Sequence, residues 1–243
     1  MQSSDIRLHL SLTPCVRLSF AVLLILLATV LTPNAAADLV GTTPTLPGDT
    51  VFPGLVAPGT NPGTLLASLT GSLVLTAGSG TAMLFSAVYM EAGGTLDFYY
   101  QIANDMSSID PLSLVANTSF KGFTTATGFR LDGSTLPGGL FIDGTVAPVT
   151  ADRNAGGDIV DFSFLPPDSA KIQPGQTSTV LVISTDATHF TSGNVSVIGG
   201  GVATVSAFEP TGAAMPTPEP SSLLLLGTGL LSALGVLRRK LQN

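Results

Sequence analysis

The feature that most constrains the fold is a set of short segments in which apolar and polar side chains alternate. The clearest is 95–102, where the even-numbered residues are apolar or aromatic and the odd-numbered ones are Thr95, Asp97, Tyr99 and Gln101. A period of two is typical of a β-strand with one face in a core and the other in solvent. The segment 159–164 alternates in the same way. We therefore expect half-buried strands here, with Tyr99 facing outward.

Further runs of β-type residues follow at regular spacing, and glycine or proline turns separate them. These runs are 65–75, 83–90, 112–116, 128–131, 179–183, 194–198 and 202–208. Glu91-Ala92-Gly93-Gly94 indicates a hairpin, because glycine supplies the positive φ that tight turns need. The run 179–183 is apolar on both faces and predicts a central strand. Since no helical period of adequate length occurs between residues 38 and 216, the pattern predicts an all-β domain, an antiparallel sandwich or a barrel-like fold.

The chain divides into six segments on these grounds. We expect a signal peptide at 1–37, a Pro/Gly/Thr-rich leader at 38–62, the β domain at 63–210, a linker at 211–222, a transmembrane helix at 223–237 and a basic tail at 238–243. In the leader, Val51-Phe52 and Leu55-Val56 predict a first edge strand. Pro53 and Pro58 argue against it, because proline cannot donate a hydrogen bond to a neighbouring strand. Inside the β domain, Asp132-Gly133 and Asp143-Gly144 predict two further turns.

The N-terminal segment has the order of a secretory signal. Arg7 and Arg17 precede an apolar run at 18–31, and Ala35-Ala36-Ala37 supplies small residues behind it. This order predicts export by the general secretion machinery and cleavage after Ala37 by signal peptidase. An uncleaved anchor is the alternative. Cleavage would remove Cys15, the only cysteine, so the mature protein would have no thiol for a disulfide or a zinc site.

The C-terminal segment predicts a short membrane anchor. Pro218-Glu219-Pro220-Ser221 precedes an uncharged stretch at 223–237, and Arg238-Arg239-Lys240 follows it. The apolar stretch is shorter than the ~20 residues of a typical transmembrane helix, but flanking serine and basic side chains can extend it. Basic residues favour the cytoplasmic side, which places the β domain outside. The signal sequence independently predicts the same orientation.

These three parts, in this order at the C-terminus, resemble a PEP-CTERM sorting domain over about residues 217–243. The resemblance implies processing by exosortase, a membrane-bound transpeptidase-like enzyme of Gram-negative bacteria. It also implies recognition at Pro218-Glu219-Pro220, removal of the tail, and release or attachment at the surface. Proteins with such tails are typically linked with extracellular polysaccharide and biofilm matrix. A plain tail anchor is the alternative, in which the prolines merely end the preceding segment.

The charge distribution argues against one class of partner. Between residues 38 and 217 the chain has 4 basic and 14 acidic side chains, a net charge of −10. Nucleic-acid binding needs clustered lysine and arginine, so no nucleic-acid partner is expected. The acidic surface favours solubility, and a cation-rich matrix around the protein is a second interpretation.

The β domain shows no clear catalytic motif. His189 is the only histidine beyond the signal region, with Asp186 three residues before it, and no Gly-x-Ser-x-Gly elbow accompanies them. Glu91 and Asp97 could form a glycosidase pair across the hairpin, but any two acids near a turn satisfy that spacing. One histidine without cysteine argues against zinc or iron. We expect no cofactor and no enzymatic activity.

One set of residues is a weak candidate for a metal site, and its members are Asp152, Asn154, Asp158 and Asp161. Calcium prefers such oxygen ligands, but the spacing matches no EF-hand and lacks the closing glutamate. Asx side chains also stabilise turns, and the turn interpretation is favoured here.

The combined expectation is an exported, non-enzymatic protein of the cell surface or extracellular matrix. It would first be anchored in the inner membrane and then sorted by exosortase, with exopolysaccharide as a candidate partner. The alternatives are a secreted module that binds polysaccharide or calcium, and a secreted hydrolase that uses His189. A binding module would show calcium- or glycan-dependent thermal shifts, and a hydrolase would lose its activity in His189→Ala.

Overall fold

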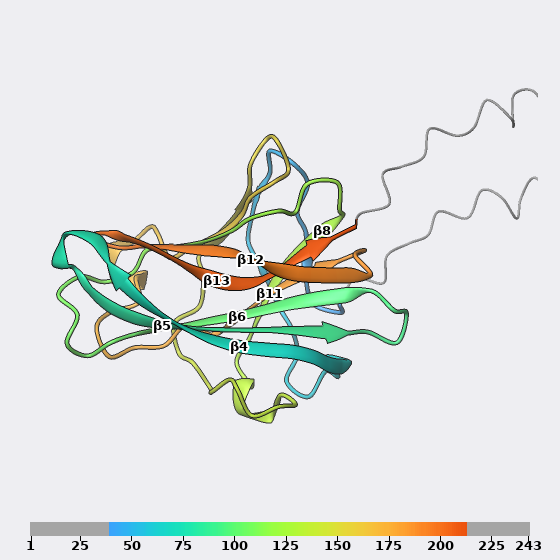
Figure 1. The fold of residues 1–243 in the computed structure, drawn as a ribbon, viewed down its shortest axis with the longest axis horizontal. Helices are drawn as coiled ribbons and strands as arrows, with labels where there is room; N and C mark the ends of the chain where they lie inside the picture. The colour runs from blue at the N-terminus through green and yellow to red at the C-terminus, as the bar shows by residue number, and fades with distance from the viewer. Residues whose placement is uncertain (1–38, 213–243) are drawn as a thin grey trace, which may run out of the picture. The chain divides into compact units, whose positions relative to one another are not determined.

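The computed structural model describes residues 39–212, which form two β-sheets and no α-helix. The sheets pack face to face as a sandwich (Figure 1). Both are antiparallel apart from one short parallel pair, so the predicted all-β antiparallel class is confirmed. Within residues 39–212 no helix is long and apolar enough to cross a membrane. The predicted signal peptide, transmembrane helix and basic tail lie outside the described residues.

Sheet A contains seven strands and sheet B contains six. In spatial order, sheet A consists of β1 (Thr43–Pro44), β8 (Thr125–Arg130), β11 (Val180–Thr185), β6 (Leu96–Asn104), β5 (Gly80–Met90) and β4 (Thr64–Leu75), and β3 (Gly54–Leu55) pairs with β8 in parallel. Sheet B consists, in order, of β13 (Val202–Thr211), β12 (His189–Ile198), β7 (Leu114–Asn117), β10 (Val160–Ser163), β9 (Thr150–Arg153) and β2 (Thr50–Val51). Three short 3-10 helices lie in the connections, at Thr76–Gly78, Gly133–Thr135 and Asp168–Ala170.

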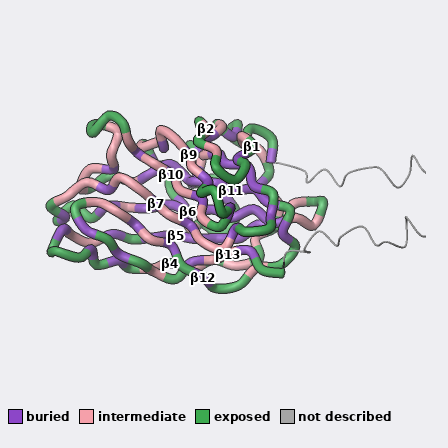
Figure 2. The backbone as a smooth tube through the Cα atoms, turned by 90° about the horizontal axis from the view of Figure 1, so that it is seen from above, coloured by how far each residue is buried: buried purple, intermediate pink, exposed green. Residues whose placement is uncertain are grey.

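The main core lies between the two sheets and uses the apolar face predicted for residues 95–102. On β6 this face consists of Leu96, Phe98, Tyr100 and Ile102, all buried. Sheet B supplies the opposite layer, from Val115, Val160, Phe162, Val195 and Val197. In Figure 2 the buried stretches run along the strands, and the exposed stretches gather at the turns. The inward side of the alternating pattern is therefore confirmed.

The outer face of sheet A carries a second core that the alternation did not predict. Tyr99, expected to face outward, is fully buried, and Tyr89 packs against it edge to face with ring centroids 4.7 Å apart. Residues of three segments outside the strands also belong to this cluster: Leu39 before β1, Val56 after β3, and Leu136 and Phe141 after β8. β6 is therefore buried on both faces, and the half-buried prediction for it is wrong. A period of two reports the pleat of a strand, and it does not report which loops later cover each face.

Two local predictions are confirmed. β11 lies between β8 and β6, and all of its residues are buried, as expected of a central strand. The hairpin between β5 and β6 turns at Glu91, whose N–H donates to the Thr95 carbonyl over 2.9 Å. Gly94 in this turn has a φ of +86°, in the region that favours glycine. Both features depend on residues that are neighbours in sequence.

The N-terminal segment that was expected to be a leader contributes strands to both sheets. β1 and β3 pair with β8 in sheet A, and β2 pairs with β9 in sheet B. The edge strand expected over 51–56 is thus two separate short strands, one in each sheet. By crossing between the sheets, this segment closes one side of the core. On the other side β4 meets β13 so closely that a Cβ on Gly71 would lie 2.4 Å from Val205 Cγ2.

Candidate functional site

His189 and Asp186 do not assemble a catalytic pair. His189 is the exposed first residue of β12, and its Nδ1 lies 3.0 Å from the Thr188 hydroxyl. Asp186 instead accepts a hydrogen bond from the Thr124 backbone N–H over 2.9 Å. A triad requires the carboxylate to orient the imidazole. In this structure the Asp186 carboxylate stabilises the loop that precedes β8.

The four calcium candidates separate into two structural roles. Asn154 Oδ1 accepts backbone hydrogen bonds from Asp158 (2.8 Å) and Ile159 (3.1 Å), so it stabilises the turn between β9 and β10. Asp152 and Asp161 lie directly opposite each other on these strands and share the outer face of sheet B. Among residues 39–212, no three His, Cys, Asp or Glu side chains lie together as a metal-binding group. Of the four predicted calcium ligands, the structure therefore brings together Asp152 and Asp161 as a pair.

This carboxylate pair has an altered acidity. Burial, and to a smaller extent the nearby Asp152 charge, raises the pKa of Asp161 to about 6. Thr50 of β2 donates a hydrogen bond to Asp152. On the other side of Asp161, the directly opposite residue of β7 is Ala116. The row that crosses β2, β9, β10 and β7 at this level therefore contains two acids and no basic side chain.

We expect Asp161→Asn to stabilise the protein at neutral pH but not at pH 4. The folded state holds the Asp161 proton up to a pKa of about 6, whereas an unfolded aspartate releases it near ~3.9. The contribution of this group is therefore full below about pH 4 and is lost as the pH rises through 6. With allowance for solvent screening, the variant should gain about 1–2 kcal/mol in urea unfolding at pH 7.5.

Asp158→Asn, at an exposed position in the turn between β9 and β10, is the matched control for this comparison. It should leave the urea midpoint unchanged at both pH values. An equal effect of Asp161→Asn at pH 4 and pH 7.5 would show that the ionisation of Asp161 does not govern the result.

Asp97 and Glu91 do not form an accessible acid pair. Asp97 is fully buried on the outer face of sheet A, whereas Glu91 is partly exposed in the hairpin turn. A glycosidase needs both carboxyls around one sugar in an accessible cleft. The burial of Tyr99 also removes the outward aromatic face that could have served as a sugar platform.

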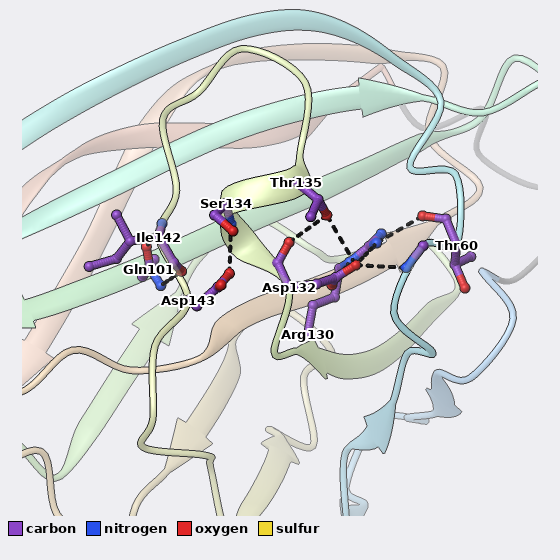
Figure 3. A network of polar contacts seen from close by, with 9 residues as sticks. Thr60, Gln101, Arg130, Asp132, Ser134, Thr135, Ile142 and Asp143 are labelled. Atoms are coloured by element: carbon purple, nitrogen blue, oxygen red, sulfur yellow. Dashed lines mark hydrogen bonds and ion pairs between the residues drawn. The ribbon is translucent and has the colours of Figure 1, made fainter.

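A buried ion pair at the end of β8 joins loops that cover sheet A (Figure 3). Arg130 is 1% exposed, and its Nε and Nη2 each lie 3.0 Å from a carboxylate oxygen of Asp132. Nη2 also donates to the Thr60 carbonyl (2.8 Å), and Asp132 accepts the Gly59 N–H (2.8 Å). The hydrogen bonds from Arg130 lower the pKa of Asp132 to about 2. The pair therefore stays ionised and connects β8 to the N-terminal segment.

Gln101 of β6 holds the loop between β8 and β9, which covers the outer face of sheet A, at Ile142. Its buried side chain accepts from the Ile142 N–H (3.0 Å) and donates to the carbonyls of Ile142 (2.8 Å) and Ser178 (2.9 Å). Within the loop, Asp143 Oδ1 accepts the Ser134 N–H over 2.8 Å. These contacts stabilise the fold, and the sequence had indicated only two turns here. In the sequence, the one feature that could have indicated these contacts is Gln101 itself, a polar side chain within a strand of mostly apolar residues.

The comparison with known proteins that bears on function concerns the tail. A family model described as the PEP-CTERM protein-sorting motif matches residues 216–240. The chain carries a PEP-CTERM sorting motif. A search of the curated proteins and a search of the solved structures found no match. The resemblance predicted from the tail is thereby confirmed.

The PEP-CTERM match spans every tail residue that the sequence singled out, namely Pro218, Glu219, Pro220, Ser221, Arg238, Arg239 and Lys240. These residues, like Ala35 and Ala37 of the predicted cleavage site, lie outside the described residues. The PEP-CTERM motif indicates an exported protein that passes through a membrane, with exosortase as its processing partner.

The β domain lies close to the PEP-CTERM motif along the chain. The described part of the chain begins and ends at the same end of the sandwich (Figure 1). There Thr211, the last residue of β13, lies opposite His189. Six peptide units separate Gly212 from Pro218, so at ~3.5 Å per residue the motif begins within about 20 Å of the domain.

Proposed function

We propose that this PEP-CTERM protein is a non-enzymatic component of the cell surface or extracellular matrix. Its signal peptide is removed after Ala37, residues 223–237 hold the intermediate in the inner membrane, and exosortase acts at Pro218-Glu219-Pro220. The β domain then reaches the surface, released or attached, in association with exopolysaccharide. The observation that carries this proposal is the sorting-motif match at residues 216–240.

The surface charge of the β domain supports this function. Residues 39–212 contain 13 acidic and 4 basic side chains. Arg130 and Arg153 are buried, and Lys171 pairs with Asp168 over 3.0 Å. In this part of the chain Lys121 is then the one exposed cation outside an ion pair. A surface of nearly one sign keeps a protein soluble and repels phosphate backbones.

The geometry around the acids and the histidine supports a non-enzymatic role. Asp186 is committed to the Thr124 N–H, and Asp97 is buried under the second core. A secreted hydrolase based on His189 would lose its activity in His189→Ala. We expect the wild type and His189→Ala to be equally inactive on ester and polysaccharide substrates, and wild-type turnover that this substitution abolishes would overturn the non-enzymatic assignment.

Cell fractionation tests the proposed location. The processed chain should be digested by protease added to intact cells, and an enzyme that degrades exopolysaccharide should release it into the medium. In a strain without exosortase, the protein should stay in the inner-membrane fraction with its tail attached. Recovery of the protein in the cytoplasm of the wild-type strain would contradict the proposal.

A calcium-binding module is a second candidate, favoured by the paired carboxylates of Asp152 and Asp161. Bound calcium would relieve the repulsion between them and raise the melting temperature of the wild type more than that of Asp161→Asn. Equal shifts with calcium and magnesium in both proteins would remove this candidate.

A further inference from the structure

One edge of sheet A is formed by a long strand without a charged side chain. β4 is the last strand of this sheet, and β5 is the one strand that pairs with it (Figure 1). The sequence of β4, Thr64–Leu75, contains neither a charged residue nor a proline. Within residues 39–212 no backbone hydrogen bond reaches β4 from any strand or loop other than β5. Among the described residues, the N–H and C=O groups on the outward side of β4 therefore have no partner strand.

The other edges of the two sheets are short or protected. β1, β2 and β3 have two residues each, and β1 contains a proline. β13 contains Glu209 and Pro210. Its Phe208 already contacts sheet A, because the N–H donates to Ser86 Oγ (3.3 Å) and the carbonyl accepts the Tyr100 hydroxyl (2.6 Å). Short strands, prolines and charges are features by which proteins prevent edge-to-edge pairing. β4 has none of these features, and with 12 residues it is the longest of the described strands.

Apolar side chains lie exposed on both faces of this edge. On the outer face Val74 is 74% exposed, and Met83 of the neighbouring β5 is 40% exposed. On the inner face Leu69 remains partly exposed at the border of the core. β4 and β5 contain no charged side chain, whereas residues 39–212 as a whole contain 13 acidic and 4 basic ones. This edge is therefore an uncharged, apolar part of an acidic surface.

We propose that β4 joins two copies of this chain in a symmetric dimer. The two β4 strands pair antiparallel, and the two copies of sheet A become one continuous sheet. A two-fold axis brings the same segment of both copies together, so the contact closes and leaves no further β4 edge exposed. Contacts between acidic parts of the surface set like charges against one another, which is unfavourable. At β4 only backbone groups and uncharged side chains meet.

The regular part of β4 is long enough for a stable contact. A bulge separates Leu65 from Ala67, and residues 67–75 then pair with β5 without interruption. About half of the N–H and C=O groups of such a strand point to each side, so two copies exchange about nine hydrogen bonds. A typical protein interface has about 10 direct hydrogen bonds. The pairing also removes part of Leu69 and Val74 from water, which favours association.

Sedimentation velocity of the purified full chain in density-matched detergent tests the proposal. The wild type should sediment as a monomer–dimer equilibrium without larger species. Thr70→Lys/Ser72→Lys, at two exposed positions of β4, sets like charges opposite one another across the two-fold axis and should raise the dissociation constant at least about tenfold. Ser192→Lys/Asn194→Lys is the matched control, since it makes the same charge change at exposed positions of β12, inside sheet B, and it should dimerise like the wild type.

Hydrogen exchange is a second measurement, which uses the wild type alone and does not depend on any variant being able to fold. Above the dissociation constant, about four more amides within residues 67–75 should be protected than after dilution to the monomer, while those of β12 should not change. Three results would overturn the proposal: a monomer at millimolar concentration, an assembly that grows without limit, or a dimer that is unaffected by Thr70→Lys/Ser72→Lys. Protection of residues 67–75 that does not depend on concentration would also overturn it, and would assign this edge to another part of the same chain.

Discussion

Replacing Arg153 with methionine is expected to lower the free energy of unfolding by about 4 kcal/mol or more. Arg153, the last residue of β9, is 4% exposed and donates to four backbone carbonyls. These belong to Phe120 (2.8 Å), Phe123 (2.9 Å), Gly157 (2.9 Å) and Thr45 (3.3 Å). Methionine fills much of the same space but donates no hydrogen bond. The Thr45 and Phe120 carbonyls keep a second donor, Thr125 Oγ1 and the Phe123 N–H. The Phe123 and Gly157 carbonyls lose the Arg153 donor, and each buried group left in this way costs about 1–3 kcal/mol. The loss should appear as a urea midpoint lower by about 2 M.

Two further variants separate the causes of this loss. Burial lowers the pKa of Arg153, because removing the guanidinium charge from water disfavours the charged form. This desolvation cost offsets part of the stability that the four hydrogen bonds contribute. Lysine keeps the charge, but its compact ammonium cannot reach carbonyls on three segments, so Arg153→Lys should also be destabilised. Lys121→Met, at an exposed cation, is the matched control and should change stability by less than about 0.5 kcal/mol. A wild-type urea midpoint for Arg153→Met would show that these carbonyl contacts do not contribute to stability.

Glu219→Ala or Pro220→Ala is expected to leave the protein in the inner membrane with its tail uncut. Proline fixes φ and disfavours helix in the preceding residue, so the sequence predicts an extended peptide with Glu219 at its centre. A carboxylate is readily hydrated and costly to move into lipid, so it marks the membrane boundary. Either substitution removes part of what exosortase is expected to recognise. Immunoblots of the medium and of the inner-membrane fraction measure the outcome.

A segment exchange is the matched control for these substitutions. Replacing residues 223–237 by a different apolar stretch of equal length keeps the anchor and should preserve release better than either point change. All three variants should unfold in urea like the wild type, because the motif lies outside the β domain. If Glu219→Ala and Pro220→Ala are both processed like the wild type, recognition does not depend on Pro218-Glu219-Pro220, and the tail acts only as a membrane anchor.

Much of the sandwich could be predicted from the sequence, because local rules decide it. The turn after β5 depends on adjacent glycines, and the central place of β11 follows from its apolar character on both faces. The inner face of β6 was visible as alternation along eight residues. The sorting motif was equally accessible, since its parts are contiguous in the chain.

The remaining features depend on segments that are distant in sequence. Tyr99 is buried because Leu136 and Phe141 of a later loop fold over it, and no pattern within β6 reports that loop. Arg130 and Arg153 entered the sequence analysis only as two of the four basic charges, yet both side chains are buried. Each donates to a backbone carbonyl that is distant in sequence, Arg130 to Thr60 and Arg153 to Phe120. For Arg130, its place near the end of the β-type run 128–131, in a domain otherwise rich in acids, was the signal that could have pointed to a buried arginine.

The intact mass of the protein recovered from the cell surface or medium tests the sorting function most directly. Cleavage by signal peptidase and exosortase predicts a chain that begins at Asp38, ends near Pro218-Glu219-Pro220 and lacks residues 223–243. The inner-membrane fraction should contain a minor species that still carries this tail. A surface-exposed protein whose mass includes residues 223–243 would contradict sorting by exosortase.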